Sequence, residues 1–175
     1  MQNKKIKIFI IAGEVSGDVL GARIIREMPN AEFVGIGGKN MQDAGLRSIF
    51  PMSDLAVMGV VEVLAHARTL MRRIKQTTNA ILQEKPDIVL TIDSPGFAKS
   101  VVENIRKSPD GQKLISNGLR FHHFVAPRYG RGGQDVQRNM QKYLINYMLF
   151  LISRFLILQN MVWIQWRLDI QLRII

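Results

Sequence analysis

The chain is 175 residues long, contains no cysteine and carries a formal net charge of +10 at pH 7. Its length suits one α/β domain with a substantial core and is too short for two. The lack of cysteine excludes disulfide scaffolds, thiolate metal sites and cysteine nucleophiles, and it fits a reducing compartment such as the cytoplasm. The charge suggests anionic partners, but residues 128–175 alone supply half of the excess, with 7 basic and 2 acidic groups.

The first pattern is an apolar run over residues 6–11 that ends at a glycine-containing turn. β-Branched and aromatic residues with little polar alternation predict a parallel strand covered on both faces. Because the run is short and acidic residues follow it at once, it predicts a first strand and not a secretory signal. Gly13 and Gly17 let the backbone turn tightly, and Ser16 or Asp18 would cap the helix that follows.

This turn has two interpretations, a ligand-binding loop at a helix N-terminus or a purely structural βα corner. Its glycine spacing matches neither the dinucleotide fingerprint nor the P-loop, so neither of those ligands is indicated. For the ligand-binding interpretation, the predicted substrate-binding residues are Gly13, Glu14, Ser16, Gly17 and Asp18.

Strand and helix patterns then alternate up to residue 127. Further strands are predicted at 31–36, 46–50, 87–93 and 118–127, separated by helical spacing. Ser53 and Asp54 would cap a long helix that ends before Pro86, and a further helix is predicted through Val101, Val102 and Ile105. Repeated βα units of this size imply an α/β fold with a doubly wound parallel sheet.

Asp93 is the second chemical signal, because it ends a predicted strand directly before a Ser-Pro-Gly turn. The carboxyl ends of parallel strands share one sheet edge, so Asp93 and the turn at Gly13 are expected to converge on one crevice. The carboxylate could act as a general base toward a hydroxyl, ligate a metal or cap the next helix. His122 and His123 are adjacent in a strand and face opposite sides, so at most one reaches the crevice.

The segment 55–64 is unusually apolar for a surface helix. Its simplest interpretation is a buried helix. The alternative is a hydrophobic surface that meets a lipid substrate or the membrane interface, with Arg68, Arg72 and Arg73 directed toward anionic headgroups.

Five motifs in chain order resemble one enzyme family, lipid-A-disaccharide synthase, and the resemblance covers residues 4–127. The motifs are Ala-Gly-Glu-Val-Ser-Gly-Asp-Val-Leu-Gly (12–21), Phe-Val-Gly-Ile-Gly-Gly (33–38), Leu-Ala-Val-Met-Gly-Val-Val-Glu-Val-Leu (55–64), Lys-Pro-Asp (85–87) and Ile-Asp-Ser-Pro-Gly-Phe (92–97). The resemblance implies an inverting glycosyltransferase of the two-domain GT-B type, with residues 1–127 as its Rossmann-like acceptor-side domain. It implies transfer of 2,3-diacylglucosamine from UDP-2,3-diacylglucosamine to 2,3-diacylglucosamine 1-phosphate, giving lipid A disaccharide 1-phosphate and UDP in lipid A biosynthesis.

The resemblance also assigns roles to individual residues. The family's candidate base falls on Asp93, which would take the proton of the acceptor hydroxyl. Gly96 and Ala98 depart from the family pattern, where many members carry Asp and Asn. The implied membrane or lipid contacts are Val57, Met58, Val60, Val61, Leu64, Arg68 and Arg72. We expect no metal, no cofactor and no nucleic acid partner, and a cytoplasmic enzyme held peripherally on the inner face of the inner membrane.

Residues 128–175 do not continue the family pattern, which would proceed as Ser-Val-Trp-Ala-Trp-Arg and a basic helix. Codons can be chosen for residues 129–141 so that the neighbouring frame spells Trp-Ala-Trp-Arg-Pro-Arg-Arg-Ala-Lys-Lys-Tyr-Ala. We therefore hypothesise a frameshifted tail, from a damaged gene or a sequencing error, on a truncated chain that does not turn over UDP-diacylglucosamine.

Taken as it stands, the tail allows other interpretations. Residues 143–166 are apolar enough to propose a transmembrane helix, but Asn146, Arg154, Gln159 and Asn160 interrupt them. The basic run 128–138 lacks the stacking aromatics of a nucleic-acid site. The alternative to an enzyme is a non-enzymatic, membrane-associated single-domain protein.

Overall fold

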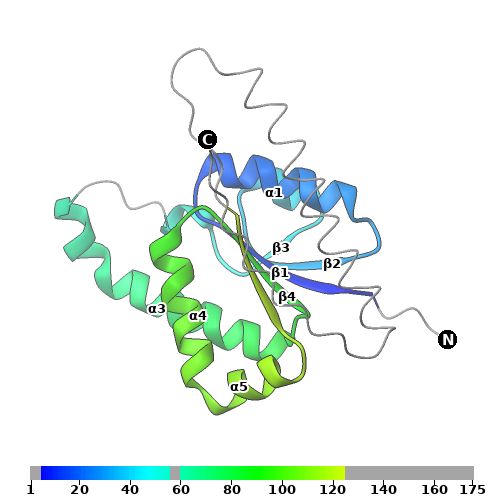
Figure 1. Ribbon diagram of the computed structural model, residues 1–175. Coiled ribbons are helices and arrows are strands. Elements are labelled where there is room, and N and C mark those ends of the chain that lie inside the picture. Colours follow the sequence, from blue (N-terminus) through cyan, green and yellow to red (C-terminus); the bar gives the residue numbers. More distant parts are fainter. Residues whose placement is uncertain (1–4, 56–59, 125–175) are drawn as a thin grey trace, which may run out of the picture. The chain divides into compact units, whose positions relative to one another are not determined.

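The computed structural model describes residues 5–55 and 60–124 (Figure 1). The chain divides into two units, residues 1–127 and 128–175, and every described residue belongs to the first. This unit holds one sheet of five parallel strands in the order β3-β2-β1-β4-β5, which confirms the predicted doubly wound sheet. The strands are β1 (Lys7–Ala12), β2 (Glu32–Ile36), β3 (Arg47–Ser48), β4 (Ile88–Ile92) and β5 (Arg120–Phe124).

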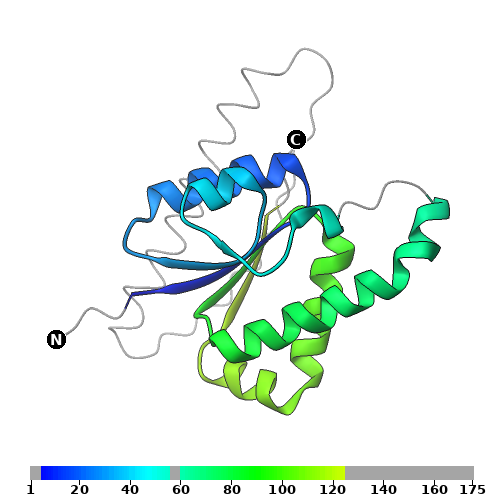
Figure 2. The same ribbon diagram turned by 180° about the vertical axis from the view of Figure 1, so that it is seen from behind.

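Helices cover both faces of this sheet (Figures 1 and 2). They are α1 (Val15–Glu27), α2 (Lys39–Asp43), α3 (Val60–Glu84), α4 (Pro95–Lys107) and α5 (Pro109–Ser116), with a 3-10 turn, η1, at Met52–Leu55. The helices α1 and α2 lie on one face, and α3, α4 and α5 lie on the other (Figures 1 and 2). None of the helices within the described ranges has the length and apolarity needed to cross a bilayer, and the segment 143–166 lies outside those ranges.

The strand β1 is buried on both faces, as its continuous apolar pattern predicted. Phe9 and Ile11 belong to the core cluster that includes Ile81 of α3 and Val101 of α4. Ile8 and Ile10 point to the opposite face because strand side chains alternate, and both are also fully buried. A strand in this position therefore tolerates no polar alternation.

The beginning of α3 differs from the sequence-based prediction. Ser53 and Asp54 do not cap this helix but lie in η1, ahead of it. The Asp54 carboxylate instead accepts a hydrogen bond from Arg73 Nε at 2.8 Å, and the Arg73 guanidinium stacks over Phe50 at 4.5 Å from the ring centre. The Arg73 side chain is thus bound within the domain, whereas the alternative, lipid-facing interpretation of this segment directed it toward anionic headgroups.

The helix predicted through Val101, Val102 and Ile105 is α4, and a second helix that was not predicted, α5, follows it directly. Ser108 ends α4 and is also the N-cap of α5, where its hydroxyl oxygen accepts a hydrogen bond from the Gly111 amide at 3.0 Å. Pro109 occupies the first position of α5, which is the usual helical place for proline. These capping signals were present in the sequence, and the prediction missed them.

Candidate functional site

The turns that follow β1 and β4 lie side by side at the carboxyl edge of the sheet. β1 pairs with β2 on one side and with β4 on the other, so the strand order reverses between β1 and β4. Ala12 is the register partner of Ile92, which places Gly13 next to Asp93. The predicted convergence of these two turns is confirmed. Parallel α/β sheets bind ligands at such a switch point.

Gly13 is in direct contact with the opposite turn. A Cβ atom at Gly13 would stand 1.8 Å from the Ser94 hydroxyl oxygen and 2.9 Å from Ser94 Cβ, so only glycine permits this approach. Asp93 and Ser94 both have left-handed backbone, with φ of 53° and 50°. Such geometry costs on the order of 1–3 kcal/mol per non-glycine residue and concentrates at functional sites.

Asp93 is half-buried in this turn, and its amide donates a hydrogen bond to the Phe124 carbonyl oxygen at 2.9 Å. The N-cap position of α4 belongs to Ser94, which disfavours the helix-capping interpretation of Asp93. Within residues 5–55 and 60–124, no three histidine, aspartate or glutamate side chains are grouped so as to hold a metal ion.

The first turn of α1 differs from its prediction. The helix begins at Val15 with Glu14 at the N-cap position, so Ser16 and Asp18 lie inside the helix and the predicted cap is wrong. The side chains of Glu14 and Ser16 are exposed beside the turn, where a ligand could reach them.

Gly17 has a packing role at this point. A Cβ atom there would lie 3.3 Å from Ala12 Cβ and 3.3 Å from Ile92 Cγ2, closer than most Cβ contacts. The glycine thus lets α1 approach both central strands.

Asp18 is 3% exposed and both of its carboxylate oxygens accept hydrogen bonds from the start of α2. Oδ2 accepts from the Asn40 amide at 3.0 Å and from Asn40 Nδ2 at 2.8 Å, and Oδ1 accepts from the Met41 amide at 3.0 Å. The carboxylate therefore caps α2 across space, which a negative charge at a helix N-terminus favours. Asp18 was predicted to bind substrate, and its capping of α2 was not predicted.

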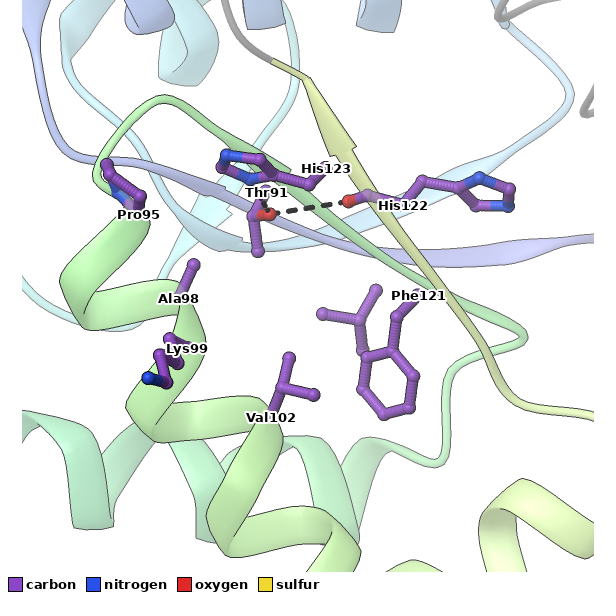
Figure 3. A pocket seen from close by; sticks show the side chains of 9 residues that line it. Thr91, Pro95, Ala98, Lys99, Val102, Phe121, His122 and His123 are labelled. Atoms are coloured by element: carbon purple, nitrogen blue, oxygen red, sulfur yellow. Dashed lines mark hydrogen bonds between the residues drawn. The ribbon is translucent and has the colours of Figure 1, made fainter. Parts of the chain in front are cut away.

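A pocket of about 370 Å³ lies between α4 and the strands β4 and β5 (Figure 3). Its lining residues are Val89, Thr91, Pro95, Ala98, Lys99, Val102, Phe121, His122 and His123. Thr91 Oγ1 lies 2.7 Å from His123 Nδ1 and donates to the His122 carbonyl oxygen at 3.3 Å. The two imidazole rings lie on opposite sides of β5, as predicted (Figure 3). Burial, and secondarily the Arg120 charge, lower the pKa of His122.

The predicted lipid-contact residues are only partly described. Val57 and Met58 lie outside the described residues, and α3 includes Val60, Val61 and Leu64, whose side chains also lie outside them. Arg68 and Arg72 are exposed and share one face of α3, since they are four residues apart. The N-terminal end of α3 extends past the sheet in both views (Figures 1 and 2).

The sheet order, the glycine turn and the left-handed Asp93-Ser94 turn together define a Rossmann-like α/β domain whose two central turns meet at the switch point. The family model described as Lipid-A-disaccharide synthetase matches residues 8–129, which is more than half of the chain. The chain belongs to the lipid-A-disaccharide synthetase family.

Its similarity to curated relatives is substantial over the same part of the chain. Lipid-A-disaccharide synthases from Granulibacter bethesdensis and Gluconobacter oxydans are 46% and 45% identical over 125 residues, which is 69% of this chain and 30% and 28% of the relatives. The synthase from Rhodospirillum centenum is 40% identical over 146 residues, 81% of this chain and 35% of the relative. The chain thus spans about a third of the length of the relatives it matches.

Proposed function

We propose that this chain supplies the acceptor-side half of a lipid-A-disaccharide synthase with Asp93 as its general base. The observation that carries the proposal is the meeting of Asp93 with the Gly13 turn at the sheet's switch point, in a chain of this family. The half-buried Asp93 sits in left-handed backbone, which is typical of functional turns.

The proposed reaction joins 2,3-diacylglucosamine from its UDP derivative to 2,3-diacylglucosamine 1-phosphate. As the acceptor hydroxyl oxygen attacks the anomeric carbon, its proton passes to the Asp93 carboxylate and UDP leaves from the opposite face. The configuration at the anomeric carbon is thereby inverted. A positioned general base contributes about 10²–10⁴-fold to such a step.

We place this half-site on the cytoplasmic face of the inner membrane, in peripheral contact with lipid. The exposed Arg68 and Arg72 on one face of α3 support this placement, because basic side chains near a surface are attracted to anionic headgroups. The apolar residues Val57, Met58, Val60, Val61 and Leu64 are the proposed lipid contacts next to them.

A hybrid enzyme tests the role of Asp93. Residues 1–127 would replace the matching segment of the Granulibacter bethesdensis synthase, and disaccharide formation from the two substrates would be measured. Asp93→Asn is expected to lower the rate by about 10²–10⁴-fold, because the amide cannot accept the hydroxyl proton. Asp110→Asn, an exposed carboxylate on α5, is the matched control and should leave the rate unchanged.

Two outcomes would contradict the proposal. One is a hybrid that folds and forms no disaccharide, and the other is an Asp93→Asn hybrid that keeps most of its activity. The 175-residue chain, assayed beside the hybrid with an Asp93→Ala control, shows whether these residues suffice for turnover.

A further inference from the structure

The pocket between α4 and the strands β4 and β5 has an apolar end and a polar end. Val102 and Phe121 lie at one end, and Thr91, Pro95 and His123 lie at the other (Figure 3). Its volume of about 370 Å³ falls in the range of small-molecule sites, which typically combine apolar walls with a few polar groups. This shape and chemistry suit a ligand with an apolar body and one polar attachment.

The polar end of the pocket adjoins the proposed catalytic turn. Thr91 is two residues before Asp93 and Pro95 is two residues after it, and both line the pocket. The register of β4 and β5 places His123 opposite Thr91, near the same carboxyl edge. A ligand whose polar group lies at this end therefore has that group close to Asp93.

Thr91 and His123 supply hydrogen-bonding groups at the same end, and the Lys99 side chain lies on α4 between Ala98 and Val102 (Figure 3). His123 Nδ1 is engaged by Thr91 at 2.7 Å, whereas its side chain is exposed and its Nε2 has no partner among residues 5–55 and 60–124. This nitrogen is available to a carbonyl or hydroxyl group of a ligand. The other end is lined by the apolar side chains of Val89, Val102 and Phe121, where a charged or polar group would lose hydration, while Lys99 is largely exposed at the pocket's side.

We propose that this pocket binds one fatty acyl chain of an acylated glucosamine. The acyl chain runs along α4 toward Val102 and Phe121, and the acyl carbonyl group lies at the Thr91–His123 pair. The inference rests on the proposed function, because that function brings an acylated sugar to Asp93. Between Pro95 and Val102 the helix rises about 10 Å, so the wall follows several methylene groups. Each buried methylene strengthens binding about fourfold, which makes the pocket a determinant of chain length.

Fluorescence titration of the complete 175-residue chain with cis-parinaric acid tests binding without catalysis. We expect saturable binding to the unmodified chain. Val102→Phe fills the apolar end and Val102→Asp places a charge in it, so each should weaken binding by about tenfold or more. Asn104→Asp, exposed on the same helix, is the matched control and should bind as the unmodified chain does.

Thermal unfolding of each variant shows whether it is folded. If Val102→Asp does not fold, Val102→Phe still tests the proposal. Non-saturable binding overturns the proposal, as does unchanged affinity in a folded Val102→Phe variant, because the probe would then bind elsewhere on the chain.

Competition distinguishes a sugar-linked chain from a membrane lipid. 2,3-Diacylglucosamine 1-phosphate should displace the probe more strongly than lysophosphatidylglycerol with the same acyl chain, and the reverse order overturns the assignment to the sugar. The two proposals can fail separately. If the hybrid enzyme is active but probe binding to the 175-residue chain does not depend on Val102, the acyl-chain pocket is refuted and the proposed function stands. If the hybrid is inactive but the acylated sugar binds in a Val102-dependent way, the proposed function is refuted and the pocket stands.

Discussion

Ser94 occupies the space that a side chain at position 13 would need, and this contact yields a first prediction. Gly13→Ala should destabilise the protein by about 1–3 kcal/mol, the usual cost of overpacking. Ser94→Gly removes the clashing atoms and relaxes the left-handed backbone, and the nearest remaining atom to the new methyl is Leu55 Cβ at 3.8 Å. The double variant should therefore regain stability in urea unfolding.

The unmodified protein, the two single variants and the double variant form a double-mutant cycle that provides its own control. If Gly13→Ala costs the same free energy of unfolding with and without Ser94→Gly, the Ser94 side chain does not pack against position 13.

Asp18 supplies a second prediction, because its carboxylate joins α1 to α2 through three hydrogen bonds. Asp18→Ala leaves buried donors without an acceptor and should lower the free energy of unfolding by about 1–3 kcal/mol. Asp18→Asn keeps one acceptor oxygen, so its free energy of unfolding should lie between those of the unmodified chain and Asp18→Ala. Asp43→Ala removes only an exposed ion pair with Lys39 and should change stability by no more than about 0.5 kcal/mol. Equal effects of Asp18→Ala and Asp43→Ala would contradict the capping role.

His122 gives a third prediction, on pH. Its pKa in the folded protein is lowered by burial and by the Arg120 charge, so the unfolded chain takes up the proton at higher pH than the folded chain. The free energy of unfolding is therefore at its full value above about pH 6.5, and it falls as the pH decreases toward the lowered pKa of His122 in the folded state. Urea midpoints measured between about pH 7.5 and about pH 5 should fall less for His122→Gln than for the unmodified chain.

A second variant tests the cause of the shift in His122. Arg120→Gln removes the repelling charge and should reduce the acid loss of stability by a smaller amount, since burial is the larger cause. An acid dependence that neither variant alters would assign that loss to other groups.

At the scale of elements, Glu84 anchors the C-terminal end of α3 to the sheet. Its carboxylate accepts from Lys7 Nζ of β1 at 3.0 Å and from Arg47 Nη2 of β3 at 2.5 Å. The hydrogen bond from Lys7 is the main cause that lowers the pKa of Glu84. This stabilisation is present above about pH 4.5 and is lost as the pH falls through the lowered pKa, below the range used for His122.

The exposed face of α3 gives a fourth prediction. Reversing both charges, Arg68→Glu with Arg72→Glu, should weaken binding to vesicles that contain anionic lipid by about tenfold or more, because each basic residue contributes about 1 kcal/mol near such a surface. Vesicle flotation at low salt measures the effect. Lys107→Glu with Lys113→Glu, exposed on α4 and α5, is the matched control. Equal losses in both pairs would indicate attraction by net charge alone.

At the scale of the whole molecule, the frameshift hypothesis makes a fifth prediction. The coding DNA after codon 127, translated in the neighbouring frame, should encode the family's Trp-Ala-Trp-Arg and the basic residues that follow. Sequencing of the genomic DNA and the transcript across this region checks it. A neighbouring frame without that motif would end the hypothesis and make the tail a genuine part of the protein.

Much of the fold was predictable because its signals are local. The buried strands β1 and β4 are continuous apolar runs, and glycine or proline marks most of the turns between elements. The helix α5 escaped prediction because it follows α4 without a loop, with Ser108 shared between the two ends. A short helix joined in this way lacks the break in periodicity that separates most elements.

The amino-acid sequence alone determined the parallel sheet, the meeting of Gly13 with Asp93 at one edge and the family. These follow from apolar periodicity, from the shared polarity of parallel strands and from motifs in a fixed order. Only the tertiary structure decided that Asp18 caps α2, that Ser94 packs against Gly13 and that an apolar pocket lies beside Asp93. Each of these depends on contacts between residues far apart in the sequence, such as Asp18 and Asn40, which are 22 residues apart. Local sequence patterns do not predict contacts of this kind.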